Sequence, residues 1–270
     1  MPRLAIEASG RTRATALAEE LRIPSTDGAE LEGFLARPPA SHVPLPGVLL
    51  FHGFPSGAVW AEHIGSDLPE LATRIADEMG FAALAVRFRG CGSSTGDFSL
   101  GGWIADVRAA IKHFRSVVPM TGLWVCGFGT GGTVGLVAAS DDPAVSGVAM
   151  AGSPADFDDW AENDARLLAH AHQVGAIKTL AYPTDPAHWS SEFRAIRAVT
   201  AAEKMAPRPL FLLHGADDDV VPQIDARLLA DAHGAGELRV LPGAGHQLRH
   251  DPRAIAILLG WLGRSSAEVL

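Results

Sequence analysis

The chain has 270 residues, of which 47 % are apolar, and a formal net charge of −9 at pH 7. This length and apolar content suit a globular protein with a sizeable core, whereas the acidic balance excludes a nucleic-acid-binding surface, which needs clustered Lys and Arg. Because the sequence has no run of about 18 apolar residues and no apolar signal-peptide core, we expect a cytoplasmic protein without a membrane span.

Short apolar strands alternate with helices along the chain. Residues 1–14 are predicted to be a flexible tail, and the strands Ala16–Ile23 and Ala29–Ala36 are joined by a Ser-Thr-Asp-Gly turn that is typical of a hairpin. Further strands are predicted at Val48–Phe51, Phe81–Val86, Leu123–Cys126, Val145–Met150, Leu210–Leu213 and Leu238–Leu241. Helices are predicted at Asp67–Met79, Trp103–Val117, Thr130–Ala139, Ile224–Ala232 and Pro252–Leu262. The alternation predicts a mostly parallel sheet of about eight strands with helices on both faces.

A longer insertion breaks this alternation between the sixth and seventh predicted strands. Residues 154–206 hold helical patterns rich in Ala, His and Trp, which we interpret as a small helical lid within a single domain spanning residues 15–270. Five large side chains of the insertion are candidates either for the wall of a ligand pocket or for the lid's own core: Phe157, Trp160, Leu167, Tyr182 and Trp189.

A glycine-rich turn follows the strand Leu123–Cys126. Its sequence, Gly127-Phe128-Gly129-Thr130-Gly131-Gly132, lacks the Lys-Ser/Thr ending of a phosphate-binding P-loop. A dinucleotide fingerprint would be expected at the first strand–helix unit instead. The turn fits a nucleophile elbow, G-x-S-x-G between a strand and a helix, except that Gly129 stands where serine is expected.

Four further loops lie in a matching order. The segment Phe51–Pro55 contains His-Gly-Phe-Pro after the third predicted strand, and Arg87–Gly96 contains Arg-Gly-Cys-Gly-Ser after the fourth. The last pair comprises Leu213–Pro222, which contains three consecutive aspartates, and Pro242–His246. Together with the elbow, these loops resemble the α/β-hydrolase superfamily, and in particular its esterase and serine-aminopeptidase-like members.

The resemblance implies roles for individual residues. The backbone N–H groups of Phe54 and Thr130 would form an oxyanion hole. Alignment of the His-Gly and Val-Pro ends of the aspartate segment makes Asp218 the acid, with Asp217 and Asp219 as solvated neighbours, and His246 would be the base. The order of nucleophile position, acid and base is that of this superfamily. The Arg87–Gly96 segment is mainly structural in such proteins.

Gly129 removes the side chain that would attack a carbonyl carbon. The elbow forces its central residue into a strained conformation that glycine adopts freely, so Gly129 is expected to stabilise the turn while abolishing acyl-enzyme chemistry. Other hydroxyl and thiol groups are not convincing substitutes, because their expected positions are buried, in another loop or directed along a helix: Thr130, Cys126, Cys91 and Ser93. The two cysteines also fit no metal motif.

Three interpretations remain open at this stage. In the first, the protein is an enzyme of hydrolase or lyase type, in which His246 acts directly as general base on water or on an acidic substrate proton. In the second, it is a ligand-binding or scaffold protein without turnover. In the third, Gly129 replaces a natural serine. All three predict a small acyl or carbonyl ligand, and none implies a metal or an organic cofactor.

Overall fold

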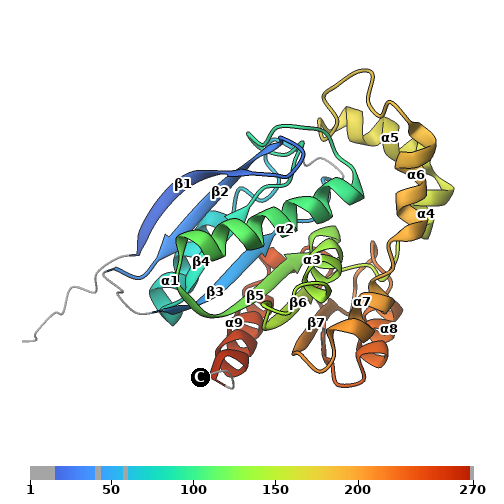
Figure 1. Cartoon of the computed structure of the whole chain (residues 1–270). Coiled ribbons are helices and arrows are strands. Elements are labelled where there is room, and N and C mark those ends of the chain that lie inside the picture. The colour runs from blue at the N-terminus through green and yellow to red at the C-terminus, as the bar shows by residue number, and fades with distance from the viewer. Residues whose placement is uncertain (1–15, 40–43, 57–59, 268–270) are drawn as a thin grey trace, which may run out of the picture.

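A computed structural model describes residues 16–39, 44–56 and 60–267, in which eight strands form one sheet in the order β1-β2-β4-β3-β5-β6-β7-β8 (Figure 1). The strands are β1 (Leu17–Pro24), β2 (Glu30–Arg37), β3 (Leu45–Phe51), β4 (Ala82–Val86), β5 (Met120–Phe128), β6 (Gly147–Ala151), β7 (Leu210–Gly215) and β8 (Glu237–Leu241). Strand β2 pairs antiparallel with both β1 and β4, and the other neighbours are parallel. The predicted α/β-hydrolase-type sheet is therefore confirmed, while the predicted tail, residues 1–14, lies outside the described residues.

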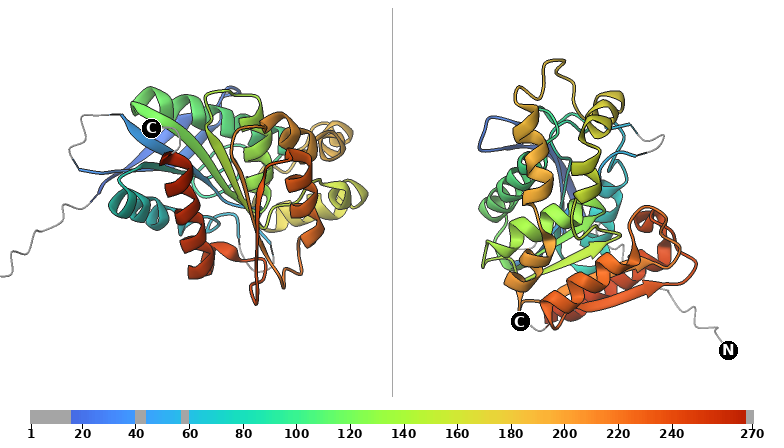
Figure 2. Two further views of the ribbon diagram at one scale, coloured as in Figure 1. Left: turned by 90° about the horizontal axis from the view of Figure 1, so that it is seen from below. Right: turned by 90° about the vertical axis from the view of Figure 1, so that its right-hand side faces the viewer.

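Helices cover both faces of the sheet (Figures 1 and 2). One apolar cluster joins the sheet to α2 (Leu100–Val117), α3 (Thr130–Ser140), α7 (Ala198–Met205) and α8 (Gln223–His233), and a second joins its other face to α1 (Leu68–Met79) and α9 (Pro252–Ala267). Strand β5 shows why both clusters form, because Leu123 and Val125 belong to the first cluster while Trp124 and Cys126 belong to the second. Successive side chains of a strand point to opposite faces, so this strand is apolar on both faces over Leu123–Cys126.

The insertion between β6 and β7 is helical. It contains α4 (Asp158–Glu162), α5 (Asp164–Gln173), α6 (Pro186–Ala195) and then α7. In Figure 1 the helices α4, α5 and α6 lie at the upper right, beyond the carboxyl end of the sheet, whereas α7 returns to pack beside α3 and α8. The insertion therefore contributes one helix to a sheet face and places the others over the end at which β3, β5 and β7 lead into their loops.

The short 3-10 helix η1 (Leu248–His250) lies between β8 and α9.

Helix α2 begins at Leu100, earlier than the apolar periodicity predicts, because the hydroxyl of Ser99 accepts a hydrogen bond from the N–H of Gly102 at 3.0 Å. This capping keeps the first turn helical although it contains two glycines.

Candidate active site

The turn between β5 and α3 is tight, and its glycines are required by different contacts. Gly129 adopts φ +54° and ψ −132°, and its N–H donates to the Ala151 carbonyl at 2.9 Å. A Cβ on Gly127 would lie 2.4 Å from the backbone of Gly132, and a Cβ on Gly131 would lie 2.1 Å from the carbonyl oxygen of His52. The flanking glycines are thus needed for backbone approach, while Gly129 adopts its positive φ without the strain that a side chain would bring.

The loop after β3 lies directly against this turn. A Cβ on Gly53 would lie 3.1 Å from the carbonyl oxygen of Phe128. The buried His52 ring holds the loop in place, because its Nδ1 is 2.7 Å from the Gly53 carbonyl and its Nε2 accepts from the Phe88 N–H at 3.1 Å. Burial lowers the pKa of His52 to about 3, so the ring is neutral and donates from Nδ1. No described residue accepts a hydrogen bond from the backbone N–H of Phe54.

An aspartate–histidine pair faces the turn from the loops after β7 and β8. His246 Nδ1 lies 3.0 Å from Asp218 Oδ2, and Asp218 Oδ1 accepts from the N–H groups of Val220 and Val221 at 3.0 and 2.9 Å. A Cβ on Gly129 would be 3.8 Å from His246 Nε2. The structure therefore brings Gly129, Asp218 and His246 together from three segments.

The environment of Asp218 keeps its carboxyl ionised. Its side chain is 1 % exposed, and this burial would raise its pKa, but hydrogen bonds from His246 and from the backbone N–H groups of Val221 and Val220 outweigh burial and hold the pKa below its usual value. Asp217 and Asp219 are exposed. An ionised Asp218 fixes the Nδ1–H tautomer of His246 and leaves Nε2 able to accept a proton.

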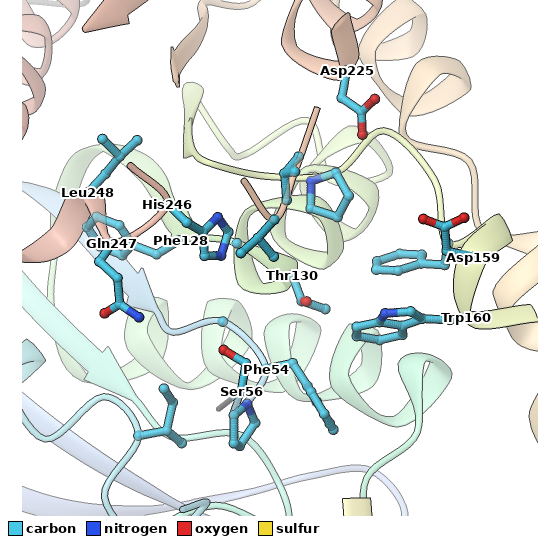
Figure 3. Close-up of a pocket in the computed structure, with 18 of the residues that line it drawn as sticks. Phe54, Ser56, Phe128, Thr130, Asp159, Trp160, Asp225, His246, Gln247 and Leu248 are labelled. Carbon is cyan, nitrogen blue, oxygen red and sulfur yellow. The ribbon is translucent and has the colours of Figure 1, made fainter. Parts of the chain in front are cut away.

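A pocket of about 370 Å³ opens above the turn (Figure 3). Gly129, Thr130 and His246 form its floor, and an aromatic wall rises beside them. In this wall the ring centre of Trp160 lies 5.2 Å from that of Phe54 and 5.0 Å from that of Phe157. No described residue accepts a hydrogen bond from the backbone N–H of Thr130, at the start of α3.

The five side chains expected from the insertion divide between pocket and core. Phe157, Trp160 and Leu167 line the pocket. The expectation of a pocket role is corrected for Tyr182 and Trp189, which do not line it. Trp189 is buried in the core instead. Its indole N–H donates to the carbonyl of Phe98 at 3.1 Å, and its ring packs on Phe193. Tyr182 is half-buried against the same core.

Charged side chains at the pocket wall were not anticipated from the sequence. Asp156, Asp159, Asp225 and Arg249 all line it. Arg249 is neutralised by Asp67, since Nε and Oδ2 are 3.0 Å apart, and Asp156 lies 3.7 Å from a guanidinium nitrogen of Arg197. Within the described residues, Asp159 and Asp225 have no cationic partner. Burial, and then the nearby charge of Asp156, raise the pKa of Asp225.

The sequence of this chain, compared with protein-family models, matches the Alpha/beta hydrolase family over residues 48–258. The chain belongs to the alpha/beta hydrolase family. No curated protein matches its sequence significantly.

Solved structures of other proteins share this alpha/beta hydrolase fold at low sequence identity. Est1E from Butyrivibrio proteoclasticus, with bound ferulic acid, gives a TM-score of 0.67 at 18 % identity over 92 % of this chain and 98 % of its own. The alpha/beta hydrolase GrgF from Penicillium sp. sh18 gives 0.70 at 20 % identity over 93 % and 99 %. The Pyrococcus furiosus esterase Pf2001 gives 0.67 at 20 % identity over 94 % and 93 %. Likeness at these identities establishes the fold alone.

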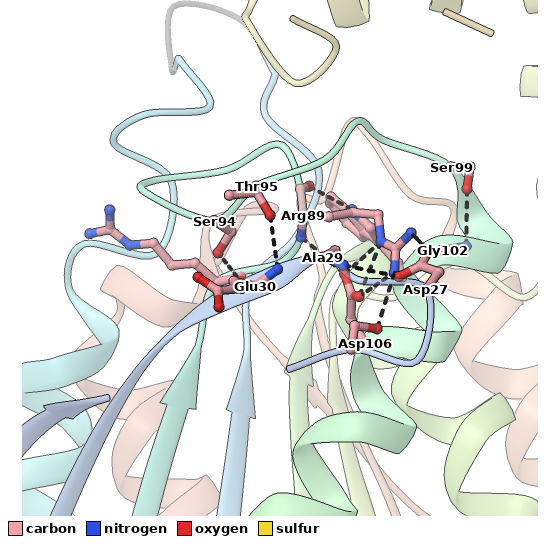
Figure 4. A network of polar contacts seen from close by, with 12 residues as sticks. Asp27, Ala29, Glu30, Arg89, Ser94, Thr95, Ser99, Gly102 and Asp106 are labelled. Atoms are coloured by element: carbon pink, nitrogen blue, oxygen red, sulfur yellow. Dashed lines mark hydrogen bonds and ion pairs between the residues drawn. The ribbon is translucent and has the colours of Figure 1, made fainter. Parts of the chain in front are cut away.

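In this alpha/beta hydrolase, the segment after β4 takes part in a polar network that joins it to α2 and to the turn between β1 and β2 (Figure 4). Arg89, whose side chain is 8 % exposed, donates to Asp106 at 2.7 Å and to Asp27 in the turn between β1 and β2. Burial alone would lower the pKa of Arg89, but the hydrogen bonds to both carboxylates raise it. The Arg89 carbonyl accepts from the Trp103 indole N–H at 3.2 Å, and the Trp103 ring lies 5.6 Å from that of His52. The network thus supports the loop beside the elbow.

The described residues offer little for thiol or metal chemistry. Cys91 and Cys126 are both buried, and burial raises the pKa of each thiol far above neutrality. Three or more His, Cys, Asp or Glu side chains are nowhere grouped as metal ligands in the described ranges. None of the helices in those ranges combines the length and apolar character that crossing a bilayer requires.

Proposed function

We propose that this protein binds a small acyl or carbonyl compound in the pocket above Gly129 and that His246 serves directly as the general base of a hydrolytic or lyase-type reaction. Gly129 occupies the position of the family's nucleophilic serine in this proposal. The observation that carries it is the geometry of the base: His246 Nε2 lies 3.8 Å from the point where a Cβ on Gly129 would stand, while Nδ1 is held by Asp218 at 3.0 Å.

The reaction follows from these positions. The space that a serine hydroxymethyl group would fill can hold a water molecule beside His246 Nε2. Nε2 takes a proton from this water as its oxygen attacks the carbonyl carbon, and Asp218 stabilises the resulting imidazolium. The oxyanion that forms would accept hydrogen bonds from the N–H groups of Phe54 and Thr130. His246 then returns the proton to the leaving alkoxide as the carbonyl reforms.

The expected rate is low. Triads that lose the serine nucleophile keep only about 10³–10⁴-fold acceleration over water, from the oxyanion hole and binding. A substrate with an acidic C–H bond would bypass this limit, because His246 can abstract such a proton without any nucleophile. Slow ester hydrolysis together with faster proton abstraction is the pattern that this arrangement favours.

The charge of the pocket wall restricts the substrate. Asp159 and Asp225 face the pocket without cationic partners among the described residues, and Arg249 is already paired with Asp67. A carboxylate on the ligand would meet unfavourable charge there, whereas a neutral or cationic ligand would not. The aromatic wall around Trp160 suits an apolar or cationic group equally well. We therefore expect neutral and cationic acyl compounds to bind better than anionic ones.

Ligand binding without turnover is the second candidate function. The observation in its favour is Gly129 itself, which relieves the backbone strain of the turn and supplies no attacking group. The source gene bears on a third interpretation, because a serine codon at this position would identify Gly129 as a replacement.

The test is hydrolysis of a panel of short- to medium-chain nitrophenyl esters that carry neutral, cationic and anionic acyl groups. The wild type is compared with His246→Ala and with His250→Ala, a matched control because His250 is an exposed histidine outside the pocket lining. Turnover by the wild type and by His250→Ala, but not by His246→Ala, supports the proposal. Turnover that survives in His246→Ala contradicts it, and an inert wild type that still quenches its tryptophan fluorescence with ligand favours binding alone.

A further inference from the structure

A second histidine lies next to the acid–base pair but outside the pocket. His214 is near the end of β7, four residues before Asp218, and its side chain is completely buried. It does not line the pocket and it is not needed as an acid or a base in the proposed reaction. A buried imidazole at such a position calls for an explanation, since an apolar side chain would fill the same space without polar groups to satisfy.

The contacts of His214 define its protonation. Its Nε2 lies 3.0 Å from the carbonyl oxygen of Val221 and 3.5 Å from Asp218 Oδ2. Both neighbours are acceptors, so Nε2 carries the proton and donates to Val221. The other ring nitrogen, Nδ1, is buried with no hydrogen-bond partner among the described residues. Nε2–H is therefore the ring's only polar group that is satisfied within the described residues, which points to a role for this N–H group.

That N–H group acts on the loop that holds the acid. Val221 donates its own N–H to Asp218 Oδ1 at 2.9 Å, while its carbonyl receives the N–H of His214. Both backbone polar groups of Val221, its N–H and its carbonyl, are thus held by hydrogen bonds. Asp218 Oδ2 is in turn flanked by two imidazoles, with His246 Nδ1 at 3.0 Å and His214 Nε2 at 3.5 Å.

We propose that His214 is a positioning residue that holds the Asp218–Val221 loop through the Val221 carbonyl, so that Asp218 keeps His246 in the Nδ1–H tautomer with Nε2 directed at the elbow. The inference rests on the proposed function, in which His246 is the base. Without the Nε2–H group of His214, the Val221 carbonyl has no hydrogen-bond donor and the loop relaxes. The hydrogen bond between Asp218 and His246 Nδ1 is then weakened.

The experiment measures the tautomer of His246 directly, by long-range ¹H–¹⁵N correlation spectra of protein labelled at histidine, at alkaline pH. His214→Phe removes the donor and replaces the imidazole by a somewhat larger apolar ring. His214→Gln and His214→Asn form a matched pair, because the Gln amide reaches the position of Nε2 whereas the Asn amide reaches only that of Nδ1. His233→Phe is the control, since His233 is also buried and its Nε2 lies 2.9 Å from a backbone carbonyl, that of Arg208.

The wild type and His214→Gln are expected to show the Nδ1–H form of His246. In His214→Phe and His214→Asn the ratio of Nδ1–H to Nε2–H forms should fall about tenfold, as expected when a hydrogen bond to a charged group is weakened. His233→Phe should leave the ratio unchanged. Should His214→Phe fail to fold, the Gln and Asn pair makes the same comparison.

Wild-type tautomer ratios in folded His214→Asn or His214→Phe would overturn the proposal. An equal change in His233→Phe would also overturn it, because general loosening would then account for the effect. The spectra need no turnover, so a wild type that hydrolyses no ester contradicts the proposed function without deciding the role of His214.

Discussion

Gly129→Ser is the most informative single change, because it has opposite effects on stability and on activity. A Cβ at this position would meet Gly53 Cα at 3.5 Å, His246 Nε2 at 3.8 Å and the Gly152 carbonyl at 4.0 Å, which are ordinary contacts. The side chain therefore fits without a clash, and the cost comes from the backbone, which holds φ +54° and ψ −132°. Backbone strain of this kind costs about 1–3 kcal/mol.

Urea unfolding followed by tryptophan fluorescence measures this cost. Gly80→Ala provides the reference, because Gly80 has φ +73° and its Cβ would meet nothing within 4 Å, so only the left-handed conformation contributes, at about 1 kcal/mol. Gly131→Ala should be the most destabilising of the three, since its Cβ would lie 2.1 Å from the His52 carbonyl oxygen. If Gly129→Ser were as stable as the wild type, the assignment of strain to this turn would be wrong.

Activity should change in the other direction. The serine hydroxyl, one bond beyond Cβ, would come within hydrogen-bond reach of His246 Nε2 and complete a nucleophile, base and acid set. Loss of the serine from such a set costs about 10⁶-fold in kcat, so we expect a gain of at least about 10³-fold in ester hydrolysis. A burst of nitrophenol should mark the acyl-enzyme. A folded Gly129→Ser protein with neither burst nor gain would refute the view that the rest of the site is competent.

The remaining predictions concern the loop beside the elbow and the pocket wall. Arg89→Met leaves the fully buried Asp106 unpaired and should lower the free energy of unfolding by about 3–5 kcal/mol. Most of this loss should be recovered in the double variant that also carries Asp106→Leu. Urea unfolding at pH 7 measures both values. The pKa of His52 falls from 6.5 to about 3 on folding, so the unfolded chain binds the extra proton between these values and stability rises with pH there, by about 1.4 kcal/mol per pH unit. His52→Gln should lack this part of the slope in unfolding curves measured across that range, and an unchanged slope would contradict the neutral, buried ring. Asp159→Asn should reduce the preference for cationic over neutral esters about two- to fivefold, measured as a ratio of kcat/KM or, without turnover, of Kd.

Local patterns predict the fold and the proximity of Gly129, Asp218 and His246 well because both depend on the order of strands. Short apolar runs between glycines and prolines indicate buried strands, and the carboxyl ends of parallel strands lie at one edge of the sheet. The loops that follow β5, β7 and β8 must therefore converge, and Gly129, Asp218 and His246 belong to these loops. Strand β5 extends beyond its predicted apolar centre because Met120 and Gly122 pair with β3, which the sequence of β5 alone does not indicate.

The residues that form the pocket wall could not be predicted from the sequence in the same way. Asp156 and Asp159 come from the insertion, whereas Asp225 comes from α8, and only the tertiary arrangement places them at one cavity. The helices of the insertion are short, so their apolar periodicity does not show which face meets the core. Nothing in the sequence therefore distinguishes Trp189, which lies in the core, from Trp160, which lines the pocket. His214 resembles any histidine before a glycine, and its importance depends on a carbonyl seven residues away.

The hairpin of β1 and β2 has a consequence for how this protein can be divided. The family match begins at residue 48, after the hairpin, yet Asp27 and Ser25 of the hairpin turn both accept hydrogen bonds from Arg89. A chimera that transplants residues 48–258 alone would carry Asp218 and His246 but would lose the two partners that Arg89 finds in the hairpin turn. The unit that can be exchanged between homologues is therefore larger than the segment that identifies the family, and it includes the tip of the N-terminal hairpin.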